Sequence, residues 1–124
     1  MKRNSVILIP ALNPDKELIQ YIQELKRNGF DDIIVVNDGS SAEYLDIFER
    51  AKQMDCKVLQ HAVNLGKGRA LKNGFNEFLN LYQDNPDILG IITVDSDGQH
   101  AVKDVIQIDD WWKKNKCAEL LLGS

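Results

Sequence analysis

The sequence has no excess of basic residues and no long apolar segment. Its 124 residues include 15 lysines and arginines against 19 aspartates and glutamates, which gives a net charge of -4. A nucleic-acid-binding surface needs a basic stripe that neutralises phosphates, so this balance argues against such a function. The longest apolar run, residues 88–94, is far shorter than the roughly 20 residues that span a bilayer. We therefore expect no membrane segment, and no signal peptide is visible before the first apolar run.

Motifs for several common kinds of site are also missing. Cys56 and Cys117 stand alone without a CxxC spacing, a usage that predicts reduced thiols in a cytoplasmic protein, with a structural disulfide as the alternative. His61 and His100 are too isolated to predict a zinc site, and His61 is expected at the surface at a strand end. Residues 66–68 lack the P-loop spacing, no Gly-x-Gly-x-x-Gly follows the first apolar run, and no serine lies in a nucleophile elbow.

The sequence does contain a regular alternation of apolar runs and amphipathic segments. Its 44% hydrophobic and 27% charged residues are typical of a globular protein, and the length suits a single domain, residues 1–124. Apolar runs that predict strands cover residues 6–9, 33–36, 57–60, 91–94 and 120–122, with helical patterns between them. This alternation predicts right-handed βαβ units, so the expected fold class is α/β, with a Rossmann-like and mostly parallel sheet flanked by helices.

Two local signals predict where helices begin. Asn13 is a favoured N-cap residue and Pro14 fits a first helical turn, so the first helix is expected to begin there. Ser40 and Glu43 match a capping box, which predicts the start of the second helix just after Ser40.

Polar residues collect where the predicted strands end. Asp95 and Asp97 follow the apolar run 91–94 directly. Because the carboxyl ends of parallel strands form the ligand-binding edge of a sheet, these carboxylates are candidates for chemistry. An Asp-x-Asp turn can direct two carboxylates at one hard cation such as Mg²⁺ or Mn²⁺. The alternative is that both residues only cap the turn and the next helix.

The first and second predicted strands end in polar turns as well, at residues 10–13 and 37–40. If these strands are neighbours of the fourth, the three turns converge on one crevice. Such a crevice suits a nucleotide diphosphate, because Asp38 could accept a hydrogen bond from a base or ribose while a cation neutralises the phosphates. Lys67 and Arg69 could add positive charge there. The alternatives are a simple turn at Asp38 and a solvated helix start at Lys67 and Arg69.

Four segments taken together carry a resemblance to a known family. Residues 6–13, 35–41, 64–74 and 94–100 resemble the nucleotide-sugar-binding part of a family 2 glycosyltransferase with the GT-A fold. The run Asp95 to His100 is most similar to the branch of dolichyl-phosphate mannose synthase and other polyprenyl-phosphate glycosyltransferases. The resemblance implies an enzyme that uses Mg²⁺ or Mn²⁺ and transfers a sugar, with inversion, from a UDP- or GDP-sugar donor. The acceptor would be a polyprenyl phosphate, a saccharide or another hydroxyl compound.

The resemblance also assigns roles to individual positions. It implies that Asp38 contacts the nucleoside and that Asp95, Asp97 and Gln99 hold the metal. Leu12 and Pro14 depart from the family pattern, which commonly has an aromatic residue and a glutamate there, so the pattern does not define base recognition. The donor-binding residues expected on this basis are Pro10, Ala11, Leu12, Asn13, Asp38, Gly66, Lys67, Asp95 and Ser96.

The chain is shorter than a GT-A catalytic domain, which is about 200 to 250 residues long. We therefore expect an N-terminal part of a longer protein, with the acceptor site and the general base beyond Ser124, so that the chain alone lacks complete transfer machinery. The longer protein would work in the cytoplasm or at the inner face of a membrane, and an open sheet edge would favour a homodimer.

Two other kinds of protein fit less well. A flavodoxin-like response or binding module that holds Mg²⁺ needs a lysine at the end of a later strand, where this chain has Gly123. A sugar nucleotidyltransferase needs a glycine-rich loop with arginine after the first strand, and residues 12–14 do not supply one.

Overall fold

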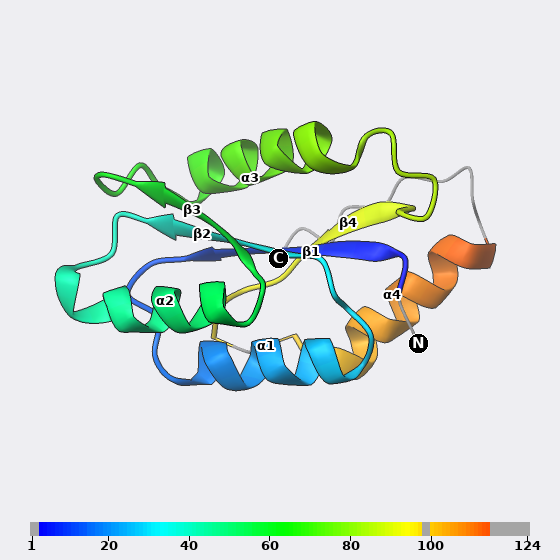
Figure 1. Cartoon of the computed structure of the whole chain (residues 1–124), viewed down its shortest axis with the longest axis horizontal. Helices are drawn as coiled ribbons and strands as arrows, with labels where there is room; N and C mark the ends of the chain where they lie inside the picture. The colour runs from blue at the N-terminus through cyan, green and yellow to red at the C-terminus, as the bar shows by residue number, and fades with distance from the viewer. Residues whose placement is uncertain (1–2, 98–99, 115–124) are drawn as a thin grey trace.

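The computed structural model describes residues 3–97 and 100–114, so the predicted strand at 120–122 lies outside the described residues. Within these residues, nine elements follow one another in the α/β order that the sequence predicts (Figure 1). Across the described part of the chain, none of the helices combines the length and the apolar character that crossing a membrane requires. The elements are β1 (Ser5–Ala11), α1 (Glu17–Arg27), β2 (Ile33–Asp38), the 3-10 turn η1 (Ala42–Tyr44), α2 (Leu45–Gln53), β3 (Lys57–His61), α3 (Lys67–Tyr82), β4 (Gly90–Thr93) and α4 (Val102–Lys114).

The described strands form one sheet in the order β3-β2-β1-β4, and every neighbouring pair is parallel. The central strands β1 and β2 are buried along nearly their whole length, whereas the edge strand β3 is largely half-buried or exposed. Strands that are covered on both faces need continuous apolar runs, which explains the patterns at residues 6–9 and 33–36. The predicted α/β class and parallel sheet are confirmed, as is the edge position of the third strand.

Helices cover both faces of the sheet, with α3 on one face and α1, α2 and α4 on the other (Figure 1). Successive side chains of a strand point to opposite faces. Accordingly, Ile7 and Ile9 of β1 join the core beneath α1, α2 and α4, while Val6 and Leu8 join the core beneath α3. α3 lies so close to the sheet that a Cβ atom on Gly74 would be 2.3 Å from a methyl group of Leu8.

The predicted start of the first helix is wrong, as is the predicted capping box, although the helical segment made of η1 and α2 does begin at Ala42, close to the predicted start after Ser40. α1 begins at Glu17, and Asn13 lies before it in a left-handed conformation with φ of 50°. The backbone N–H of Asn13 donates to Ser40 Oγ (2.9 Å), and Asn13 Oδ1 accepts from the N–H of Ser41 (3.0 Å). The side chains of Asn13 and Ser40 thus link two loops, and neither caps a helix. The predicted capping box with Glu43 is replaced by the 3-10 turn η1, which has no side-chain cap.

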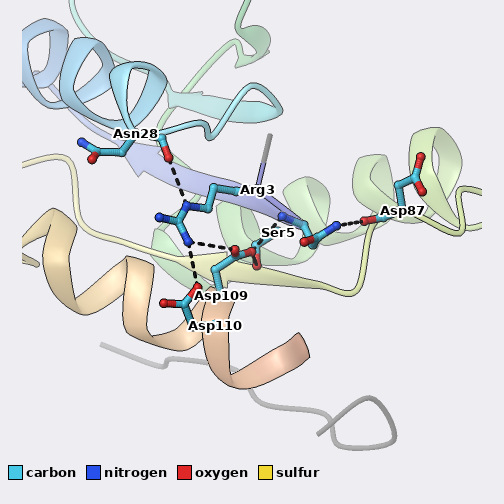
Figure 2. Close-up of polar contacts among 7 residues, drawn as sticks. Arg3, Ser5, Asn28, Asp87, Asp109 and Asp110 are labelled. Atoms are coloured by element: carbon cyan, nitrogen blue, oxygen red, sulfur yellow. Dashed lines mark hydrogen bonds and ion pairs between the residues drawn. The ribbon is translucent and has the colours of Figure 1, made fainter. Parts of the chain in front are cut away.

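A polar cluster fixes α4 to the amino end of β1 (Figure 2). Asp109 is fully buried, and its Oδ1 accepts a hydrogen bond from Ser5 Oγ (2.8 Å). Arg3 donates from Nη1 to Asp110 Oδ1 (2.8 Å) and from Nε to the carbonyl oxygen of Asn28 (3.1 Å). These contacts lie at the amino ends of the strands, so they hold the scaffold from the side opposite to the polar turns.

Candidate functional site

A cavity of about 320 Å³ lies at the carboxyl ends of β1 and β2 and beside the segment that follows β4. The three polar turns that the sequence places at strand ends therefore do meet around one space. Its wall also includes the loop before α3 and the first residue of that helix. The lining residues are Pro10, Ala11, Leu12, Asp38, Asn64, Gly66, Lys67, Asp95, Ser96 and Asp97.

Asp38, the last residue of β2, is held by three hydrogen bonds. Its Oδ1 accepts from His61 Nδ1 (2.8 Å) and from the backbone N–H of Leu65 (2.9 Å), and its Oδ2 accepts from the N–H of Gly66 (3.0 Å). Burial by itself would raise the pKa of Asp38, but the hydrogen bonds from His61, Leu65 and Gly66 together outweigh it and lower the pKa. The site therefore contains a buried, ionised and firmly oriented carboxylate.

The loop before α3 packs directly on the turn after β2. A Cβ atom on Gly39 would lie 2.3 Å from the backbone N of Asn64 and from the backbone C of Val63, so only glycine allows this approach. Asn64 Oδ1 also accepts from the N–H of Gly66 (2.8 Å), which closes an Asx turn. This turn leads into α3 and brings Lys67 to the wall of the cavity.

The acidic pair Asp95 and Asp97 follows β4 on the other side of the cavity. Lys67 Nζ donates to Asp95 Oδ1 (2.9 Å), and His100 Nε2 lies 3.7 Å from Asp95 Oδ2. The hydroxyl of Tyr21 on α1 donates to the carbonyl oxygen of His100 (2.6 Å). Burial, with a smaller contribution from nearby carboxylates, raises the pKa of Tyr21 to about 12, so the phenol keeps its proton for this bond.

The side chains at this end of the cavity suit a hard cation. Magnesium is commonly held by one or two carboxylates together with phosphate oxygens of the substrate, and Asp95 and Asp97 both border the cavity. Residues 3–97 and 100–114 contain no group of three or more His, Cys, Asp or Glu side chains that could hold a metal ion on its own. The ammonium group of Lys67 shows that a positive charge is accommodated beside Asp95. Gln99, the third predicted ligand, lies outside the described residues.

Most of the predicted donor-binding residues line the cavity, but two assignments differ from expectation. Asn13 is absent from the lining, because its polar groups bond to the neighbouring loop. The prediction that His61 lies at the surface is wrong, because only 9% of this residue is exposed and it bonds to Asp38. Asn64 also lines the cavity although it was not among the predicted residues. Its Asn-x-Gly spacing, typical of an Asx turn, is a signal that could have identified it.

Sequence comparison gives the site a family context. The family described as Glycosyl transferase family 2 matches residues 6–120. The chain belongs to this family. This membership agrees with the predicted GT-A fold.

Relatives with sequence similarity are considerably longer than this family 2 chain. It is 39% identical to an uncharacterized protein of Methanocaldococcus jannaschii, over 82% of the chain and 39% of that protein. It is 29% identical to the UDP-N-acetylglucosamine–dolichyl-phosphate N-acetylglucosaminyltransferase of Methanococcus voltae, over 82% of the chain and 44% of that enzyme. The chain thus spans about two fifths of the length of these relatives. The second of them agrees with the predicted polyprenyl-phosphate branch.

Proposed function

We propose that the cavity is the donor site of a glycosyltransferase that binds a UDP- or GDP-sugar together with Mg²⁺ or Mn²⁺. In a protein as long as its relatives, this site would deliver the sugar, with inversion, to an acceptor. The observation that carries the proposal is the convergence of Asp38, Lys67 and the acidic pair Asp95 and Asp97 on one cavity. Its volume of about 320 Å³ lies within the range of small-molecule sites.

Asp38 suits the nucleoside end of the donor. An ionised carboxylate offers about four lone-pair positions, and three are used by donors among the described residues. Two of those donors bind Oδ1 and one binds Oδ2, so Oδ2 can accept one further bond from a base N–H or a ribose hydroxyl. Leu12 lines the same cavity and is 45% exposed, which offers an apolar surface to the face of a base.

The amino end of α3 suits the diphosphate. Backbone N–H groups in the first turn of a helix favour anions, and Gly66 and Lys67 bring this turn to the cavity wall. The ammonium group of Lys67 adds a full positive charge. Both features would neutralise phosphate oxygens at the end of the cavity that holds the acidic pair.

Asp95 and Asp97, with Gln99 as the sequence predicts, would hold the divalent cation. When bound, the cation would stabilise the negative charge on the departing diphosphate. Asp38 would orient the nucleoside, and Lys67 would bind phosphate. A polyprenyl phosphate is the favoured acceptor, because the name of the Methanococcus voltae relative specifies dolichyl phosphate.

Calorimetric titration of the chain with UDP and GDP, each with and without MnCl₂, tests this proposal. We expect Mn²⁺ to strengthen nucleotide binding and Asp97→Asn to abolish that gain, because one ligand to the cation is lost. Asp84→Asn is the matched control: it makes the same chemical change at an exposed residue between α3 and β4 and should bind as the unmodified chain does. Nucleotide binding that is unchanged by Mn²⁺ and by Asp97→Asn would contradict the proposal.

A further inference from the structure

A line of polar side chains runs from the half-buried Asn73 on α3 through the buried His61 to Asp38. Asn73 Nδ2 lies 2.8 Å from His61 Nε2, and His61 Nδ1 lies 2.8 Å from Asp38 Oδ1. The side chains of His61 and Asp38 are only 7% and 6% exposed. The two residues are also direct partners in the parallel register of β2 and β3. His61 does not line the cavity, so it can affect a ligand only through its neighbours.

The position of the proton on the His61 ring follows from the ionised state of Asp38. An ionised carboxylate only accepts hydrogen bonds, so the 2.8 Å contact requires a proton on His61 Nδ1. His61 Nε2 then either accepts from the amide of Asn73 or donates to it, depending on the orientation of that amide. In both arrangements the Nδ1–H group donates to Asp38, and Asn73 fixes the plane of the imidazole ring.

We propose that His61 is a positioning residue of the donor site, which orients Asp38 through its Nδ1–H group. This inference rests on the proposed function. With Oδ1 held by His61, the carboxylate can accept a hydrogen bond from the N–H of Leu65 on Oδ1 and another from the N–H of Gly66 on Oδ2. The Leu65 and Gly66 amides define the loop that leads to Lys67, so the orientation of one carboxylate sets both the nucleoside and the phosphate ends of the cavity.

A purely structural role would make a different demand on this position. If His61 only filled space at the edge of the sheet, any side chain of similar size would serve. If it positions Asp38, the replacement must present a donor where Nδ1 stands. Asparagine places its amide nitrogen near the position of Nδ1, whereas glutamine places its amide nitrogen near that of Nε2. The pair His61→Asn and His61→Gln therefore separates the two roles, with His61→Leu as the variant that lacks both donors.

Two readouts test the proposal. The first is hydrogen exchange of the Leu65 and Gly66 amides by NMR, which needs no nucleotide. The second is the dissociation constant of UDP and GDP with MnCl₂. In His61→Leu and His61→Gln we expect exchange of the Leu65 amide to be faster, and nucleotide binding weaker, by roughly tenfold to hundredfold, the effect of losing a hydrogen bond to a charged group. Exchange of the Gly66 amide should be faster by a smaller factor, because its N–H also donates to Asn64 Oδ1. In His61→Asn, the exchange rates of the amides and the affinity for nucleotide should return most of the way to those of the unmodified chain. Exchange at the Val35 amide, in the buried strand β2, controls for general unfolding.

Two results would overturn the inference. One is His61→Leu with unchanged exchange at Leu65 and Gly66, and the other is His61→Asn that behaves no better than His61→Gln. If the unmodified chain binds neither UDP nor GDP, the proposed donor site fails, but amide exchange still decides whether His61 positions Asp38. The failure of one idea is thus distinguishable from the failure of the other.

Discussion

Replacing Gly39 by alanine should force the turn after β2 away from the loop before α3. Gly39 has φ of 75°, and a Cβ atom there would lie 2.3 Å from the backbone N of Asn64 and 2.7 Å from the carbonyl oxygen of Val63. Backbone atoms cannot avoid the clash by changing rotamer. Since carbon atoms pack at about 3.5 to 4.0 Å, the loop would have to move by about 1 Å.

Such a movement breaks hydrogen bonds at Asp38. The N–H groups of Leu65 and Gly66 lie 2.9 and 3.0 Å from its oxygens, and about 1 Å of extra separation takes either of them beyond bonding range. A hydrogen bond to a charged group contributes about 1.5 to 3 kcal/mol, and a left-handed backbone costs an L-residue about 1 to 2 kcal/mol. If one of the two bonds is lost, Gly39→Ala should lower the free energy of unfolding by about 2.5 to 5 kcal/mol.

Urea unfolding followed by circular dichroism measures this loss. Gly68→Ala is the matched control, because a Cβ atom on Gly68 meets no atom within 4 Å. Gly68 also lies in the first turn of α3, where alanine should be neutral or stabilising by up to about 1 kcal/mol. If the free energy of unfolding of Gly39→Ala is within about 1 kcal/mol of that of the unmodified chain, the close packing of the two loops is not what holds the site together.

Two further predictions concern buried carboxylates. Asp109→Ala should destabilise the chain by about 3 to 5 kcal/mol in urea unfolding, because it leaves buried polar groups such as Ser5 Oγ without their partner. Asp110→Ala, at a half-exposed residue, should lower the free energy of unfolding by less than about 1 kcal/mol. Equal losses of stability in Asp109→Ala and Asp110→Ala would contradict a special role for Asp109. Because the pKa of Asp38 is lowered in the folded state, its contribution to stability is complete above its unfolded pKa of about 3.9 and is lost as the pH falls through the folded value. Acid unfolding should therefore show a smaller loss of stability below about pH 4 in Asp38→Asn than in the unmodified chain, and identical acid profiles would contradict this assignment.

The sequence predicts the sheet well because burial on both faces leaves a simple signal. Residues 6–9 and 33–36 are continuous apolar runs, and both form central strands. The convergence of polar turns was also predictable, because parallel strands must present their carboxyl ends at one edge. These inferences need only the periodicity of the chain and the handedness of βαβ units.

Contacts between loops were not predictable in the same way. The local sequence predicts that Asn13 is a helix cap, but its side chain accepts a hydrogen bond from the N–H of Ser41, 28 positions away. His61 reads as a surface residue because nothing near it in the sequence explains its burial. Its partner Asp38 is 23 positions away, and the pairing requires the exact register of β2 and β3. Local propensity describes an isolated segment, whereas these side chains respond to a neighbour that only the assembled sheet provides.

The two ends of the cavity also differ in how firmly they are held, and this bears on how a ligand would enter. Asp38 is buried and has three hydrogen bonds, whereas the pair of Lys67 and Asp95 is 50% and 25% exposed. Ion pairs exposed to water contribute only about 0 to 1 kcal/mol. If the proposed donor binds here, its diphosphate can draw Lys67 away from Asp95 Oδ1 at little cost, which makes that oxygen available to a cation. The nucleoside end would then act as the fixed part of the site, and the cation end as the part that rearranges on binding.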